Sequence, residues 1–124
     1  IISVFILLIF VVISFNHLPN FKNRLSFWQF ATSQSDTNSF AYNNLGAMLY
    51  LEGRIDEAEQ IYQKALHINP NTKMANNNLG VIYLDRREFD LAESAFNKEL
   101  EINPGYDRAL YNLEYLYFLK SQLK

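Results

Sequence analysis

The chain has 124 residues, which is enough for one domain at most. Lysine and arginine number 11 and aspartate and glutamate 13, so the formal net charge is −2. This balance argues against a nucleic-acid binder, which needs a concentrated basic surface. Cysteine is absent, which excludes a disulfide framework, a thiolate nucleophile and a zinc site with cysteine ligands.

The chain begins with an uncharged apolar run. Residues 1–15 read IISVFILLIFVVISF, and no charged residue comes before Lys22. A helix needs about 20 apolar residues to cross about 30 Å of hydrocarbon. We therefore predict that residues 1–18 are a transmembrane helix, truncated where the sequence begins, and that the protein is located in a membrane. The alternative is a buried helix or strand of a soluble domain, because Ile, Val and Phe also suit strands.

The side of the membrane on which the rest of the chain lies is left open. Lys22 and Arg24 come directly after the apolar run, and the positive-inside rule then favours a cytoplasmic position for the rest of the chain. Residues 19–38 are predicted to form a linker and a packing helix. Pro19 suits the first position of a helix, and Leu25 and Trp28 lie on one helical stripe.

The remaining residues contain an internal repeat. Several pairs of residues share one and the same spacing: Leu45-Gly46 with Leu79-Gly80, Ala58 with Ala92, Tyr62 with Phe96, and Asn69-Pro70 with Asn103-Pro104. This spacing, a period of about 34 residues, is typical of solenoids built from helix–turn–helix units.

At these positions the chain resembles the tetratricopeptide repeat (TPR) family. The family pattern places aromatic, Leu-Gly, Ala and Pro residues at set offsets, and it predicts TPR 1 at residues 39–72 and TPR 2 at residues 73–106. The second repeat departs from the pattern at Asn76, where the aromatic residue is missing, and at Leu100, where the small residue is missing. The resemblance implies an all-α solenoid of two full repeats, flanked by a helix on each side and preceded by the transmembrane helix.

The small residues of the pattern predict close helix packing. Because Gly46 and Ala58 are small, the two helices of the first repeat are expected to approach closely. Close packing offsets the cost of a helical glycine, which reaches about 1 kcal/mol. The carboxylates follow the surface spacing of helices, and we expect them to face water: Glu52, Asp56, Glu57, Glu59, Asp85, Glu88, Asp90, Glu93, Glu99 and Glu101.

Residues 107–124 are predicted to be a C-terminal capping helix, or alternatively a truncated third TPR. Glu114 occupies the glycine position of the pattern, where a partner helix would otherwise pack. The helix is very apolar, and an exposed apolar surface favours contact with another protein or with a second copy. We therefore expect a covering partner or homo-oligomerisation through this last helix.

A second resemblance covers residues 16–46. The order of an apolar run, then Asn23-Arg24, then a repeat beginning near Ala41 resembles the C-terminal border of polytopic glycosyltransferases that use lipid-linked sugars and carry a TPR tail. It implies a non-catalytic tail of a larger enzyme, with the tail on the extracytoplasmic side, opposite to the side that the charges favour. None of that family's catalytic loops is in the match.

No catalytic, cofactor or metal-binding pattern is found in the sequence. His17 and His67 each lack a second ligand three or four residues away. The four glycines are isolated and form no phosphate-binding loop. The pair Arg86-Arg87 is too small for a nucleic-acid site. We expect no enzyme activity in this chain, no cofactor, no metal and no nucleic-acid partner.

The candidate site is therefore a surface. In TPR proteins the first helices of successive repeats line a concave groove that binds peptide segments or partner helices. Asn43 and Asn77 are expected to hydrogen-bond a peptide backbone, because an amide offers a donor and an acceptor. The matching positions are Phe40, Asn43, Ala47, Tyr50, Met74, Asn77, Val81, Leu84, Arg108, Tyr111, Tyr115 and Phe118.

These observations predict a membrane-tethered, non-catalytic module for protein–protein interaction. Two alternatives stay open. One is the TPR tail of a polytopic glycosyltransferase. The other is a purely structural packing or homo-oligomerisation module. As an alternative to a groove, Tyr50, Tyr111 and Tyr115 are core or cap residues.

Overall fold

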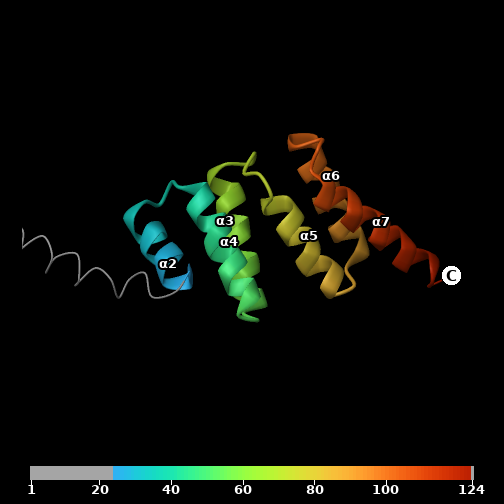
Figure 1. The fold of residues 1–124 in the computed structure, drawn as a ribbon, viewed down its shortest axis with the longest axis horizontal. Coiled ribbons are helices and arrows are strands. Elements are labelled where there is room, and N and C mark those ends of the chain that lie inside the picture. Colours follow the sequence, from blue (N-terminus) through green and yellow to red (C-terminus); the bar gives the residue numbers. More distant parts are fainter. Residues whose placement is uncertain (1–23, 124) are drawn as a thin grey trace, which may run out of the picture.

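The computed structural model describes residues 24–123, and the regular structure within them is entirely helical. The helices follow one another along the long axis of the molecule, from α2 at one end to α7 at the other (Figure 1). Their bounds are α2 Arg24–Gln34, α3 Ser39–Leu51, α4 Ile55–Ile68, α5 Ala75–Asp85, α6 Phe89–Ile102 and α7 Asp107–Ser121. The predicted all-α solenoid is confirmed for this part of the chain.

Each helix packs against the next one in the sequence, and α5 also contacts α7. This arrangement is that of stacked helical hairpins, in which α3 pairs with α4 and α5 pairs with α6. The first helices of successive hairpins, α3, α5 and α7, thus form one layer, and α2, α4 and α6 form the other. A solenoid of this kind exposes one layer along each of its long faces.

The hairpin turns show why the helices end where they do. Asn38 caps α3, with its Oδ1 accepting a hydrogen bond from the backbone N of Ala41 at 3.0 Å. Gly53 follows α3 with a φ of 76°, which glycine adopts without strain. Arg87 holds the same position in the second repeat and has a φ of 62°. The turn between the two helices of a hairpin is therefore left-handed at the same place in both repeats.

The two helical glycines each make room for an aromatic ring. A Cβ atom built on Gly46 would lie 2.7 Å from Cε1 of Tyr62, and one built on Gly80 would lie 2.5 Å from Cε1 of Phe96. The predicted close approach is therefore present in both repeats. The side chain that fills the space beside each glycine is this ring of the second helix, so the small size of Ala58 is only part of the reason.

The hydrophobic core of the first repeat includes residues of the second. Leu79 and Ile82 of the second repeat belong to the same buried cluster as Leu45, Leu49 and Tyr62 of the first. Because this core is completed by the next hairpin, a single repeat cannot bury its own apolar face.

The ends of the solenoid complete the cores from both sides. Leu25 and Trp28 of α2 pack against the first cluster. A second cluster joins α6 to α7 and consists of Ala92, Phe96, Leu113 and Leu116. The last helix therefore covers the second hairpin in the way that α5 covers the first.

The predicted membrane localisation needs correction. The predicted transmembrane helix at residues 1–18 lies outside the described residues. Between residues 24 and 123 no helix has both the length and the apolar composition that a membrane crossing requires. This finding contradicts the predicted location of the protein in a membrane.

One carboxylate that was expected to face water is buried. Glu99 is 0% exposed and accepts hydrogen bonds from the backbone N of Met74 at 2.7 Å and of Asn77 at 3.4 Å. The first N–H groups of a helix need acceptors, and Met74, the N-cap of α5, offers no side-chain acceptor. Glu99 holds the position of Ala65 in the second repeat, so it is Glu99 and not Leu100 that replaces the small residue of the pattern.

Candidate functional site

The residues predicted to line a groove lie on α3, α5 and α7, apart from Met74, which caps α5. Their exposure differs widely along the molecule. Asn43 and Asn77 are buried, whereas Tyr111 is 67% and Phe118 57% exposed. The exposed apolar part of this surface is therefore concentrated on α7. The remaining positions differ as well: Ala47, Val81 and Leu84 are half-buried, and Arg108 is exposed.

Asparagine side chains connect the first helices of successive hairpins. Asn78 on α5 donates from Nδ2 to Oδ1 of Asn43 on α3 at 3.2 Å. Asn112 on α7 makes the same bond to Asn77 on α5 at 2.9 Å. The two bonds are one repeat apart and hold α3, α5 and α7 side by side. Asn43 and Asn77 thus use their carbonyl oxygens for the stacking of the repeats.

A tyrosine–carboxylate bond joins the C-terminal ends of α3 and α5. The hydroxyl of Tyr50 donates to Oδ2 of Asp85 at 2.6 Å. This bond, with partial burial and the negative charge of Asp85, raises the pKa of Tyr50 to about 12. Tyr50 is therefore a neutral hydrogen-bond donor at physiological pH, and its hydroxyl is already used within the protein.

Two predicted residues lie apart from the others. The ring of Phe40 is 59% exposed and contacts Trp28 of α2 edge-on, with 5.7 Å between the ring centres. Met74 has a φ of 69° and donates its backbone N–H to Glu99. Phe40 thus extends the surface toward α2, and Met74 contributes through its backbone to the start of α5.

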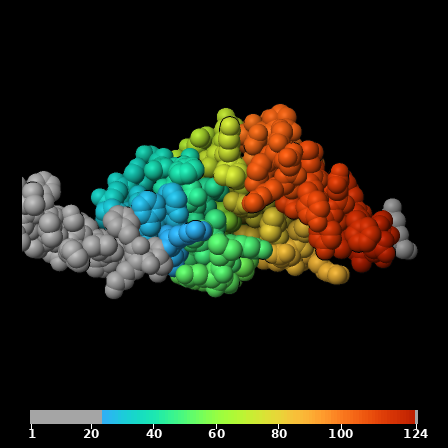
Figure 2. Space-filling view, viewed as in Figure 1, coloured from blue at the N-terminus to red at the C-terminus, as the bar shows by residue number. Residues whose placement is uncertain are grey.

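The last helix carries most of the exposed aromatic side chains. Tyr115 is 45% and Tyr117 49% exposed, beside the still more exposed Tyr111 and Phe118. In Figure 2 the side chains of α7 (red) form the surface at the end of the molecule opposite α2. Tyr111 lies at the position that Asn43 and Asn77 occupy in the two preceding repeats. On the third first helix, α7, an exposed tyrosine thus replaces the asparagine.

Ion pairs that recur with the period of the repeat connect successive hairpins. Arg86, directly after α5, pairs with Asp56 and Glu59 of α4, both at 2.6 Å. Lys120 holds the same position one repeat later and makes the equivalent pairs with two carboxylates of α6, at 3.1 Å and 2.9 Å. Because these charged groups are in contact with solvent, their attraction is screened and contributes little to stability. Each set of pairs links the end of a first helix to the second helix of the preceding hairpin.

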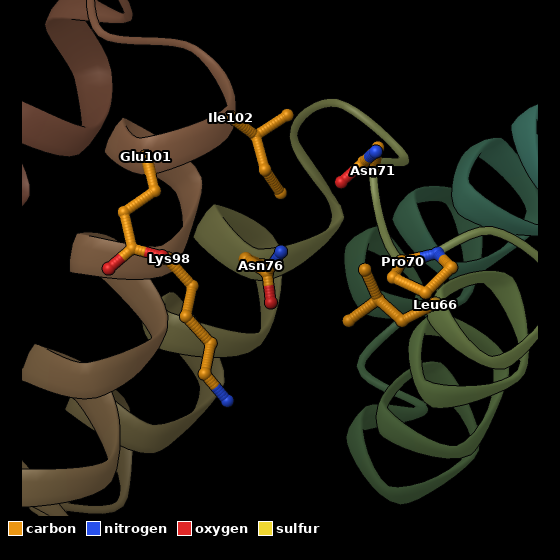
Figure 3. Close-up of a pocket in the computed structure, with 7 residues that line it drawn as sticks. All are labelled: Leu66, Pro70, Asn71, Asn76, Lys98, Glu101 and Ile102. Carbon is orange, nitrogen blue, oxygen red and sulfur yellow. The ribbon is translucent and has the colours of Figure 1, made fainter.

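The structure contains a cavity that was not predicted from the sequence. It measures about 380 Å³ and lies between the ends of α4 and α6, with α5 beneath it (Figure 3). The sequence signal for it is Asn76, because a missing aromatic residue in the pattern leaves its space empty. The cavity is lined by Leu66, Pro70, Asn71, Asn76, Lys98, Glu101 and Ile102.

Metal chemistry finds no support in the described residues. Between residues 24 and 123 no three side chains of His, Cys, Asp or Glu are grouped closely enough to hold a metal ion. The absence of enzyme activity in this chain stays a prediction.

Comparison with known proteins supports the interpretation of the repeats. Residues 39–72 and residues 69–107 each match the family described as "Tetratricopeptide repeat". Together the matches run from residue 39 to residue 107, which is more than half of the chain. No curated protein matches the sequence.

Solved structures share the fold. The crystal structure of YrrB, described as a TPR protein with an unusual peptide-binding site, is 26% identical with a TM-score of 0.66, over 73% of this chain and 46% of that one. The crystal structure of MamA is 26% identical with a TM-score of 0.70, over 78% of this chain and 57% of that one. A MamA RS-1 ArsTM double mutant is 24% identical with a TM-score of 0.69, over 93% of this chain and 66% of that one.

The chain spans about half the length of the first two of these structures. None of the three is described as a glycosyltransferase. The resemblance of residues 16–46 to the tail of such enzymes therefore stays a prediction, and part of that segment lies outside the described residues.

Proposed function

This chain belongs to the tetratricopeptide repeat family and is a module for protein–protein interaction; we propose that it binds an extended peptide segment or a partner helix along α3, α5 and α7. The observation that carries the proposal is the register of this surface. Asn43, Asn77 and Tyr111 occupy the same position on three successive first helices, one repeat apart. A ligand lying across the helices would meet two amides and then an exposed aromatic ring.

The amide groups suit the backbone of such a ligand. Asn77 accepts from Asn112 through Oδ1, and its Nδ2 makes no hydrogen bond to the described residues. Because no buried side-chain nitrogen or oxygen among these residues lacks a partner, this Nδ2 reaches the surface. It can donate to a peptide carbonyl, and Asn43 has the same arrangement one repeat earlier.

The exposed rings suit the side chains of the ligand. Tyr111 and Phe118 lie about two helical turns apart on α7, and aromatic anchors contribute a large share of the energy at protein interfaces. The described peptide-binding site of YrrB supports peptide recognition as a use of this fold. Two repeats offer a short surface, so we expect weak to moderate affinity.

The test is a selection of peptides on the whole chain. Peptides enriched from a random 12-residue display library would be measured for binding to the wild type and to the double variant Tyr111→Ser/Phe118→Ser. The matched control is Leu110→Ser, which removes an apolar side chain that is 45% exposed from a position of α7 outside the predicted groove. Binding lost only in the double variant, with an unchanged circular dichroism spectrum, supports the groove. Equal binding to all three proteins contradicts it.

Self-association through α7 is a second candidate function. The observation that favours it is the concentration of exposed apolar side chains on this one helix, since a monomer rarely exposes a large contiguous apolar patch. Sedimentation equilibrium distinguishes the two functions. A wild-type dimer that becomes monomeric in Tyr115→Ser/Phe118→Ser supports self-association. A wild type that stays monomeric at a protein concentration 100 times the peptide dissociation constant contradicts it.

A further inference from the structure

In the first repeat an aromatic ring occupies a defined slot beneath a lysine. Tyr42 of α3 is 5% exposed, and Nζ of Lys64 on α4 lies 4.3 Å from the centre of its ring. The hydroxyl of Tyr42 donates to Oδ1 of Asp36 at 3.4 Å. This ring contact combines a cation with an aromatic face, an arrangement that is attractive wherever it forms.

In the second repeat the lysine is present but the ring is not. Asn76 occupies the position of Tyr42, Lys98 that of Lys64, and Pro70 that of Asp36, each one repeat later. These three residues line the cavity of about 380 Å³ between α4 and α6. The cavity is thus the slot of the first repeat without its aromatic side chain.

The walls of the cavity match an aromatic ring. Figure 3 shows Asn76 at the floor, with Leu66 and Pro70 on the side of α4 and Lys98 and Ile102 on the side of α6. Leu66, Pro70 and Ile102 are apolar, which suits the faces and edges of a ring. Lys98 is exposed and makes no ion pair within the described part of the chain, so its ammonium group is available to a ligand.

The floor of the cavity is polar and in contact with solvent. Asn76 is 7% exposed, and its side chain makes no hydrogen bond to the described residues. Since none of their buried side-chain nitrogen or oxygen atoms is without a partner, the amide must meet the solvent of the cavity. A second cavity of about 200 Å³ shares Leu66, Asn76 and Lys98 and continues along α6 to Leu91. This continuation gives room for a residue next to the inserted ring.

We propose that this slot is a second binding site, which takes an aromatic side chain of a partner protein. The ring would lie where the ring of Tyr42 lies in the first repeat, with Lys98 over its face. Pro70 replaces the acceptor Asp36, so a hydroxyl on the ring gains nothing at that position, and phenylalanine should bind at least as well as tyrosine. The slot is separate from the α3–α5–α7 surface, so the failure of either proposal leaves the other unaffected.

The test uses two small probes on the ¹⁵N-labelled 124-residue chain. N-acetylphenylalanine amide and N-acetylleucine amide are titrated separately, and the backbone amide shifts are followed by NMR. We expect the aromatic probe to shift Leu66, Asn71 and Ile102, and the leucine probe to bind about two- to five-fold more weakly, which is the factor that a cation–π contact supplies. Equal binding of the two probes, or shifts confined to α7, would overturn the proposal.

Two variants test separately the empty space of the slot and the contribution of the lysine to probe binding. Asn76→Tyr supplies the ring from within, so it should abolish probe binding and raise the thermal midpoint. Lys98→Met should weaken the phenylalanine probe about two- to five-fold and leave the leucine probe unchanged. Lys64→Met is the matched control, because it removes the equivalent lysine of the first repeat and should change neither affinity. An unchanged affinity of the phenylalanine probe in Lys98→Met contradicts the proposal. If Asn76→Tyr does not fold, the comparison of Lys98→Met with Lys64→Met is the deciding test.

The same spectra test whether a second copy supplies the ring. Shifts of Leu66, Asn71 and Ile102 that change when the protein alone is diluted would place an aromatic side chain of another copy in the slot, and would overturn a separate partner. Dilution without change, together with binding of the aromatic probe, supports the partner.

Discussion

Asn112 on α7 donates a hydrogen bond from Nδ2 to Oδ1 of Asn77 on α5 at 2.9 Å. The equivalent bond joins Asn78 to Asn43 one repeat earlier. The bonds cross from one first helix to the next, in the direction in which the solenoid grows. These bonds give asparagine a structural role at both the donor and the acceptor position of the repeat, independent of any ligand. They also hold the free amide groups of Asn43 and Asn77 at a fixed spacing along the molecule.

Removing the donor of this bond should weaken the attachment of α7. In Asn112→Ala the Oδ1 of the buried Asn77 loses its partner, and we expect the free energy of unfolding to fall by about 1 kcal/mol. Urea denaturation measures this change. Asn97→Ala, at an exposed asparagine of α6, is the control and should change stability by less than about 0.5 kcal/mol. Equal effects of the two substitutions would show that the bond adds nothing.

A methyl group at Gly80 should destabilise the fold, although alanine is the better helix former. Alanine gains about 1 kcal/mol in helix propensity over glycine. Its Cβ would lie 2.5 Å from Cε1 of Phe96, which is 0% exposed. Overpacking of this kind costs about 1–3 kcal/mol, so the net change should be a loss. Thermal denaturation by circular dichroism reports the shift.

Gly105→Ala is the matched control for that substitution. Nothing lies within 4 Å of a Cβ atom built on Gly105, and its φ is not positive. The substitution should therefore be neutral or slightly stabilising, by up to about 1 kcal/mol. A loss at Gly105 as large as the loss at Gly80 would rule out the ring contact as the cause.

The buried Glu99 should be needed for the start of α5. Glu99→Ala restores the residue type of the first repeat, but it leaves the backbone N of Met74 and of Asn77 without their acceptor. We expect a loss of about 1–3 kcal/mol, the cost of an unsatisfied buried donor. Hydrogen exchange should show faster exchange at the first turn of α5. Glu101→Ala, at an exposed glutamate of the same helix, should leave both quantities unchanged.

Stability should fall at alkaline pH partly because of Tyr50. Its pKa is raised from 10 to about 12, first by the hydrogen bond to Asp85 and then by burial. The folded state therefore favours the neutral phenol, and this contribution is complete below pH 10 and lost as the pH rises from 10 to about 12. Tyr50→Phe should lower stability at pH 7 and flatten the loss between these pH values.

Two measurements check the Tyr50 prediction. The absorbance of phenolate at alkaline pH should show one tyrosine fewer with a high pKa in Tyr50→Phe. Urea denaturation at a series of pH values then gives the slope of stability. The pKa of Tyr117 is raised as well, because its hydroxyl donates to Glu93, and Tyr117 remains in the variant as an internal reference. An unchanged slope would exclude the Tyr50–Asp85 bond as a source of stability.

Much of the fold could be predicted from the spacing of a few residues. Leu45-Gly46 and Leu79-Gly80 set the repeat, and the rings of Tyr62 and Phe96 lie against the two glycines as that spacing implies. The predicted membrane localisation is contradicted because no helix of residues 24–123 has the character of a membrane span, and the apolar run from which it was inferred lies outside the described residues. The burial of Glu99 was not foreseen because a helical-surface pattern cannot show that the partner helix of the same hairpin, α5, begins against that position.

The sequence by itself determined that this protein is a stack of helical hairpins, because periodic small and aromatic residues report a packing rule that repeats along the chain. Only the tertiary structure decided which polar groups are free and which spaces are empty. The side-chain carbonyl of Asn77 accepts a hydrogen bond from Asn112, and a cavity lies between Asn76 and Lys98. Both depend on contacts between hairpins, and such contacts exist only once the hairpins are placed against one another.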